Sequence, residues 1–325
     1  MRAQASETQT KKALVFSLSY TIIHTEATIM VSLCPAVHWA FLCALLQGAT
    51  FVACLYICAT HRRAGGRAPD RDDPRVVKDR FLRVGIASLI APVFTLAAAL
   101  LPGAQDSCAL DGVPIARLFG LWTPSFVQAA LLPLVLTMVL FLGPLVMAWI
   151  DRDDSVGSML DRLRAALEWS EYQRHLKLRN LVIGPLAEEW VFRVCMCPLL
   201  FGAGLSDVAI VFGSAFVFGL AHIHHVFDAD VSWAVVAVQF TYTSLFGAYS
   251  SYLFLRTGHL IGPLLAHSFC NSQGLPNFGG VPGHTHARML SAAFIVGLAS
   301  FALLVFLDAI YRPALFGSVF WDEKL

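Results

Sequence analysis

The chain has 325 residues, of which 57% are hydrophobic and 14% are charged, and its formal net charge is +1. Soluble domains usually carry about 25% charged residues, so this composition excludes an ordinary soluble protein and favours a helical protein with several membrane spans. The nearly balanced charge gives no indication of a nucleic-acid partner. The eight cysteines have no disulfide-framework spacing, and we interpret them as small buried hydrophobic residues.

The chain begins with a polar, mildly basic stretch, and an apolar run follows at residues 13–33. His24 and Glu26 interrupt this run, which argues against a membrane span there. We therefore expect residues 1–35 to form an N-terminal extension.

Further along the chain, apolar segments alternate with short polar stretches. Together they predict an all-α, polytopic transmembrane helical bundle of about eight spans. The expected spans are residues 37–59, 84–101, 126–150, 181–200, 208–222, 233–256, 259–272 and 292–310. We assign residues 36–311 to one transmembrane domain and residues 312–325 to a C-terminal tail.

Two of the connecting stretches are rich in basic residues. Residues 60–83 contain eight arginines and lysines and residues 151–180 contain six, whereas residues 102–120 contain only Arg117. Two expected spans separate the basic stretches, so both lie on one side of the membrane, which the positive-inside rule makes the cytosolic side. Leucines spaced among the charges of residues 151–180 predict an amphipathic helix on the membrane surface.

Three of the apolar segments carry ionisable or amide side chains, which are costly inside a bilayer and indicate a functional site. They are Glu188, Glu189 and Arg193 in residues 181–200, His222 in residues 208–222, and His267 with Asn271 in residues 259–272. Each group needs a partner where water is absent, so we expect one shared polar pocket. The catalytic core would then lie within residues 180–275.

Glu188 is the charged residue that simple pairing does not explain. Glu189 and Arg193 lie one helical turn apart and can form an ion pair, whereas Glu188 is rotated by about 100° from Glu189. Burial next to a second carboxylate favours Glu188 as a general base. His222 could orient the same water or shuttle its proton.

His267 and Asn271 also lie one turn apart and could form an oxyanion hole, because both can donate a hydrogen bond to a carbonyl that becomes tetrahedral. A purely structural role, hydrogen bonding between helices, stays open for them. So does a thiol nucleophile at Cys270.

Two other functions would use some of the same residues. A zinc-dependent membrane protease could bind its metal through His222, His225 and His267 with a glutamate, although the sequence lacks a His-Glu-x-x-His helix. A proton-coupled transporter is the second alternative, because intramembrane glutamates and histidines also form proton relays. The absence of a visible inverted repeat counts against a transporter.

At these residues the sequence resembles the type II CAAX prenyl endopeptidases, which belong to the glutamate-dependent intramembrane proteases. The Glu-Glu-x-x-x-Arg motif of that family is matched at residues 188–193. Its Phe-x-x-x-His motif is matched at residues 218–222, and its His-x-x-x-Asn motif at residues 267–271. The resemblance extends over roughly residues 60–280.

The resemblance implies a multi-pass protein of the endoplasmic reticulum membrane, with an active site accessible from the cytosolic side. It implies a metal-independent endopeptidase without a cofactor. Its substrates would be farnesylated or geranylgeranylated CAAX proteins such as Ras-type GTPases, from which it would remove the C-terminal tripeptide. In this reading Glu188 and His222 activate the water, His267 and Asn271 form the oxyanion hole, and Glu189 and Arg193 support them.

Overall fold

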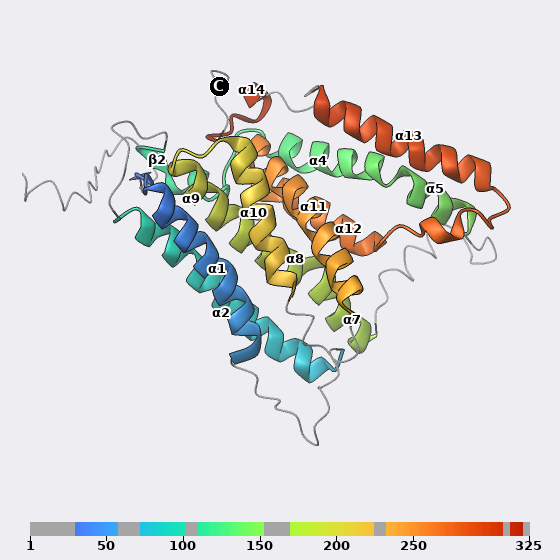
Figure 1. Ribbon diagram of the computed structural model, residues 1–325, viewed down its shortest axis with the longest axis horizontal. Coiled ribbons are helices and arrows are strands. Elements are labelled where there is room, and N and C mark those ends of the chain that lie inside the picture. The colour runs from blue at the N-terminus through green and yellow to red at the C-terminus, as the bar shows by residue number, and fades with distance from the viewer. Residues whose placement is uncertain are drawn as a thin grey trace, which may run out of the picture.

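The computed structural model describes residues 30–57, 72–101, 110–152, 170–223, 232–307 and 313–320, and nearly all of them are helical (Figure 1). The predicted all-helical membrane fold is confirmed. The helices are α1 (Val37–Ile57), α2 (Pro74–Ala98), α3 (Ile115–Leu118), α4 (Phe126–Leu140), α5 (Leu142–Ile150), α7 (Glu171–Leu178), η3 (Arg179–Ile183), α8 (Gly184–Glu189), η4 (Trp190–Cys195), α9 (Met196–Gly202), α10 (Asp207–His222), α11 (Trp233–Thr257), α12 (Ile261–Gln273), η6 (Phe278–Gly280), α13 (Ala287–Phe306) and α14 (Pro313–Phe316).

Three of the described helices, α1, α2 and α13, are long and apolar enough to cross a membrane. Helices α4 and α5 meet the same criterion as a pair that is bent by 69°, which makes up to four spans within the described residues. The bend follows Leu140, whose carbonyl would accept from residue 144 in a continuous helix, and Pro144 has no N–H. The other expected spans correspond to shorter or more polar helices, so the total of about eight stays a prediction.

Helix α2 begins ten residues before the expected span at 84–101. Asp73 caps it by accepting a hydrogen bond from the Arg75 N–H, and Pro74 fits the first helical position because it needs no donor there. The second half of the first basic stretch is therefore helix rather than loop. Arg83 within it is buried, forms an ion pair with Asp79 and donates to the Leu55 carbonyl of α1 at 2.6 Å.

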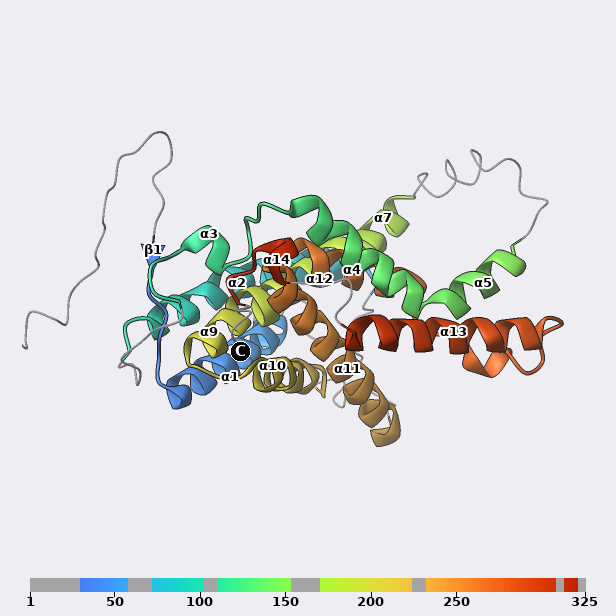
Figure 2. The same cartoon turned by 90° about the horizontal axis from the view of Figure 1, so that it is seen from above.

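The helices pack into a bundle with an extension on one side. Helices α1 and α2 lie side by side along one flank, and α10 packs against α11 at the centre (Figure 1). Helix α13 lies along α4 and α5 and reaches away from the remaining helices with them (Figure 2). The largest hydrophobic core lies around Phe192 and Phe218, whose rings meet edge to face with centroids 5.0 Å apart.

Contacts between the ends of the elements group the connecting segments into two sets. In the first set, Asp72 pairs with Arg179 at 3.0 Å, which joins the two basic stretches at one end of the bundle. His284 pairs with Asp151 at 2.8 Å and belongs to the same set. The leucines that predict the amphipathic helix lie within residues 153–169, outside the described part, and the described chain resumes just before α7.

The second set lies at the opposite ends of α1 and α2. A short strand β1 (Met30–Val31) pairs antiparallel with β2 (Val113–Pro114), and Ser32 donates a hydrogen bond to Asp111. Cys34, next to β1, is disulfide-bonded, so the interpretation of every cysteine as a buried hydrophobic residue is wrong for Cys34. Among the described cysteines, the free ones are Cys43, Cys54, Cys195, Cys197 and Cys270.

Candidate active site

The two candidate glutamates lie in α8, a six-residue helix between two π-helical turns, η3 and η4. Single π turns are frequent at functional sites because their wider spacing re-aims side chains. In η3 the Gly184 N–H bonds the Arg179 carbonyl, five residues earlier. A Cβ at position 184 would lie 2.7 Å from that carbonyl oxygen, so the wide turn favours glycine.

This turn leaves backbone carbonyls free for another helix. Because Gly184 bonds Arg179 and Pro185 has no N–H, the Asn180 carbonyl has lost its helical donor. Asn271 of α12 supplies the missing hydrogen bond through Nδ2 at 2.9 Å. Ser268, one turn earlier, donates to the Leu181 carbonyl at 2.7 Å. Helix α12 is thereby held against the segment that leads to the glutamates.

Glu189 is completely buried and has three partners. Its Oε2 atom lies 3.1 Å from Arg193 Nε, which confirms the predicted ion pair. Ser250 Oγ of α11 donates to the same oxygen at 2.5 Å. His267 Nδ1 donates to Oε1 at 2.6 Å. Ser250 was not among the predicted site residues, because its only signal in the sequence is a small polar side chain in a span that contains several.

Arg193 is also fully buried and lies against an aromatic ring. Its guanidinium carbon is 4.4 Å from the ring centroid of Phe218, a distance typical of a cation–π contact. Phe218 in turn contacts the His222 ring, with centroids 4.6 Å apart. Phe218 therefore connects the charged pair to the end of α10.

Glu188 differs from Glu189 in its access to solvent. Its side chain is 23% exposed, and its Oε2 atom lies 3.7 Å from His267 Nε2. His267 therefore lies between the two carboxylates, one nitrogen toward each. The structure thus brings together the glutamate pair and His267, as the expectation of a shared polar pocket requires.

His222 and Asn271 lie at the edge of this cluster. His222 Nδ1 donates to the Phe218 carbonyl at 2.8 Å, which leaves Nε2 as the acceptor nitrogen in the neutral ring. Asn271 is exposed, and one hydrogen of its side-chain amide is donated to the Asn180 carbonyl. Neither residue makes a described contact with Glu188. His222 is connected to the cluster through Phe218, and Asn271 is connected to it through α12, which also carries His267.

No group of three or more histidine, cysteine or carboxylate side chains is placed to hold a metal ion within the part of the chain that the structure describes. His225, which the zinc alternative requires, lies outside that part, as does His224.

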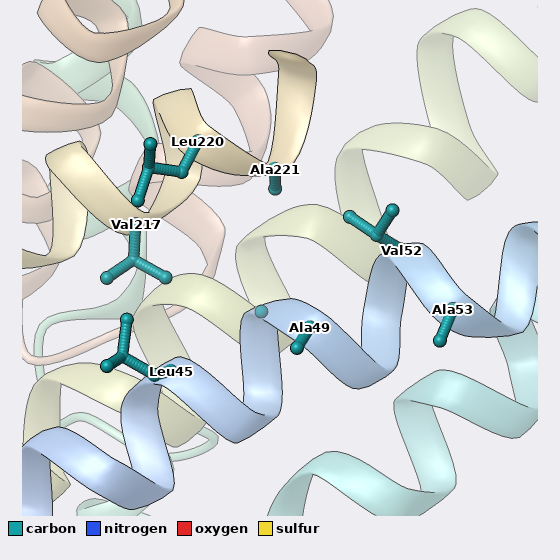
Figure 3. A pocket seen from close by; sticks show the side chains of 8 residues that line it. Leu45, Ala49, Val52, Ala53, Val217, Leu220 and Ala221 are labelled. Atoms are coloured by element: carbon teal, nitrogen blue, oxygen red, sulfur yellow. The ribbon is translucent and has the colours of Figure 1, made fainter. Parts of the chain in front are cut away.

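An apolar groove of about 520 Å³ lies between α1 and α10 (Figure 3). Val217, Leu220 and Ala221 line it from α10, in the turns that lead to His222. The facing side chains of α1 come from Leu45, Ala49, Val52 and Ala53, with Gly48 between them. The described residues that line the groove include no charged or polar side chain.

Residues 174–273 match the family described as Type II CAAX prenyl endopeptidase Rce1-like, and this range contains every candidate site residue. The chain is 40% identical over 259 residues to CAAX prenyl protease 2 of Homo sapiens, covering 77% of this chain and 76% of that protein. It is 37% identical over 251 residues to CAAX prenyl protease 2 of Rattus norvegicus (77% and 74% covered) and 33% identical over 249 residues to that of Arabidopsis thaliana (70% and 76% covered). No solved structure matches the chain.

Proposed function

Because the chain belongs to the type II CAAX prenyl endopeptidases, membrane proteases that act on prenylated CAAX proteins, we propose that Glu188 and His222 activate the water that cleaves its substrates. The observation that carries this proposal is the contrast between adjacent carboxylates. Glu189 is 0% exposed with three partners, whereas Glu188 is 23% exposed and free to meet a water. A general base must lie within hydrogen-bond reach of the proton that it removes.

The reaction removes the C-terminal tripeptide by attack of the water on the carbonyl of the prenylated cysteine. Glu188 accepts the proton of the attacking water. His222 supports this step because Nδ1 donates to the Phe218 carbonyl, which leaves the lone pair of Nε2 available to accept a hydrogen bond from the water. The tetrahedral carbon then expels the amine of the tripeptide, which takes the proton that Glu188 removed from the water and passed to His267.

His267 and Asn271 stabilise the negative oxygen that forms on the carbonyl. Asn271 has a second amide hydrogen beyond the one that bonds Asn180. His267 Nε2, at 3.7 Å from Glu188 Oε2, can receive the proton that Glu188 takes and then donate to the oxyanion. Catalytic hydrogen bonds of this kind are often long without substrate and shorten when it binds.

Glu189 and Arg193 act by holding His267 in place. The ionised Glu189 accepts from Nδ1 of His267 and fixes both the ring and its tautomer, which is the role of the carboxylate in other carboxylate–histidine pairs. Arg193 and Ser250 keep that carboxylate charged and oriented where water is absent. The mechanism needs no metal ion.

We further propose that the protein lies in the endoplasmic reticulum membrane with this site on the cytosolic side. Asn180 and Asn271 adjoin Arg179, which belongs to the end of the bundle where the two basic stretches meet. The opposite end contains the disulfide-bonded Cys34, and disulfides form in oxidising compartments such as the lumen of the reticulum. Prenylated Ras-type GTPases approach from the cytosol and are the substrates that this orientation suits.

The test is cleavage of a farnesylated CAAX peptide by the purified protein in liposomes, with and without a zinc chelator. We expect release of the tripeptide to resist the chelator. Glu188→Ala should lower kcat by at least about 100-fold, the lower end of what general-base catalysis contributes. Asp207→Ala is the matched control, because it removes a carboxylate from the far end of α10.

Two results would contradict the mechanism. Chelator-sensitive cleavage would assign the histidines to a metal site. Normal turnover by folded Glu188→Ala would exclude this glutamate as the base.

A further inference from the structure

The groove between α1 and α10 is hollow because its residues are small at the centre. Ala49, Ala53 and Ala221 leave the space that larger side chains would fill, and Leu45 and Leu220 extend along its sides (Figure 3). Ala49 and Leu220 are exposed, so the groove is open toward the lipid rather than closed as an internal cavity. Its volume of about 520 Å³ is within the usual range for small-ligand sites.

The inner wall of the groove adjoins the candidate active site. A Cβ at Gly48 would lie 3.7 Å from the Phe192 ring, so Phe192 is directly behind the groove. Phe192 contacts Phe218, which contacts both Arg193 and His222. Ala221, which lines the groove, immediately precedes His222 in the chain. A ligand in the groove therefore ends within one helical turn of a proposed catalytic group.

We propose that this α1–α10 groove holds the prenyl chain of the substrate during cleavage. The inference rests on the proposed function, because it gives the groove a role in the same reaction. In a CAAX substrate the prenylated cysteine supplies the scissile carbonyl, so the chain and the reacting bond belong to one residue. A prenyl chain along Leu45, Ala49 and Val217 leaves the cysteine at the His222 end of the groove.

The groove contributes position rather than a hydrophobic driving force. A prenyl chain already lies in the bilayer, where lipid tails are as apolar as leucine, so transfer into the groove gains contact energy and little else. Fixing the chain in one place turns an encounter in the membrane into a defined approach of the carbonyl to the base. The wholly apolar lining matches an isoprenoid and offers nothing to the charged head group of a phospholipid.

The first test fills the groove with a side chain. Ala49→Phe adds a ring at an exposed position of α1, where it displaces no packed neighbour. We expect KM for a farnesylated peptide to rise about tenfold in liposomes, and kcat to fall because the carbonyl loses its defined approach to the base. For a peptide with the shorter geranyl chain, the same substitution should raise KM less. Ala209→Phe is the matched control, because Ala209 is exposed on α10 and lies outside the groove.

The second test does not depend on catalysis. A CAAX peptide whose farnesyl chain ends in a photoreactive diazirine is cross-linked to the wild type and to Glu188→Ala. We expect both proteins to be labelled within residues 45–53 and 217–221. Labelling elsewhere, no labelling, or labelling of these residues only by a photoreactive phospholipid would overturn the proposal, as would an unchanged KM in Ala49→Phe. If Glu188→Ala still cleaves, the proposed mechanism fails while the cross-links still decide the location of the prenyl chain.

Discussion

Glu189 receives its three partners from three different parts of the chain, two of them on Oε2 and one on Oε1. Arg193 comes from η4, Ser250 from α11 and His267 from α12. A fully buried carboxylate is stable only when it is paired and hydrogen-bonded, since its desolvation otherwise costs several kcal/mol. The geometry around His267 is therefore set by how completely Glu189 is satisfied.

Ser250 and Ser251 allow this dependence to be tested with adjacent residues. Both are completely buried, but Ser250 bonds the Glu189 carboxylate whereas Ser251 bonds Ser214 at 2.8 Å. We expect Ser250→Ala to lower kcat by about tenfold or more, because a hydrogen bond to a charged group contributes about 1.5–3 kcal/mol. Ser251→Ala should cost only about 1 kcal/mol of stability and leave kcat near that of the wild type. Equal kcat values for the two variants would contradict the positioning role.

The ion pair itself should separate stability from activity. Arg193→Met leaves Glu189 buried without its cation and should destabilise the protein by about 3–5 kcal/mol. The double variant with Glu189→Gln removes both charges and should recover most of that stability without recovering cleavage. Denaturant unfolding in detergent, together with the peptide assay, measures both properties. A double variant as unstable as Arg193→Met would show that the unpaired charge of Glu189 does not cause the loss of stability.

At the scale of the elements, the site depends on two close helix packings. The carbonyls freed by η3 hold α12 through Asn271 and Ser268. Helix α10 approaches α11 so closely that a Cβ at Gly219 would overlap Ser244 Oγ. Small residues permit such contacts in membranes, where packing rather than the hydrophobic effect joins helices.

Two glycines of α10 test the second packing. Gly219→Val should separate α10 from α11 and displace Phe218, lowering stability by about 1–3 kcal/mol together with activity. Gly213→Val is the control, since no atom lies within 4 Å of its added Cβ. Both variants change helix propensity equally, so a difference in thermal stability reports the packing alone. Identical melting temperatures for the two variants would contradict a contribution of this close packing to stability.

The sequence predicted the helical class, most helix positions and the Glu189–Arg193 pair, because hydrophobic runs and i,i+4 spacing are local properties. It did not predict the π turns or the role of Ser250, which depend on partners far along the chain. It also missed the bend after Leu140 and the early start of α2, although Pro144 and the Asp73-Pro74 cap are visible in the sequence. The role of Asn271 was predicted only in part. Its spacing from His267 is evident in the sequence, but the free Asn180 carbonyl that it bonds is not.

At the scale of the whole molecule, the two sets of connecting segments define its two faces. Asp72, Arg179, Asp151 and His284 belong to one face, and β1, β2 and Cys34 belong to the other. The proposed site opens near the first face, through Asn180 and Asn271.

Cysteine labelling in sealed microsomes tests this arrangement. Gln173→Cys and Thr285→Cys, both exposed near the first face, should react with an impermeant maleimide without detergent. Leu121→Cys, which is exposed toward the other face, should react only after detergent is added. Labelling of the unsubstituted protein gives the background from its native cysteines. Labelling of Gln173→Cys and Thr285→Cys from opposite sides would contradict the arrangement.

The pairing of Glu189 with Arg193 also bears on how the protein is made. The two residues lie four positions apart in one helical segment, so their ion pair can form as soon as that segment is helical. His267 follows 78 residues later, so during translation the pair is available before α12 has been synthesised. The segment can therefore enter the membrane with Glu189 already neutralised and only Glu188 as an uncompensated charge. The same ion pair that holds Glu189 in the finished protein thus first assists the insertion of the helical segment that contains it.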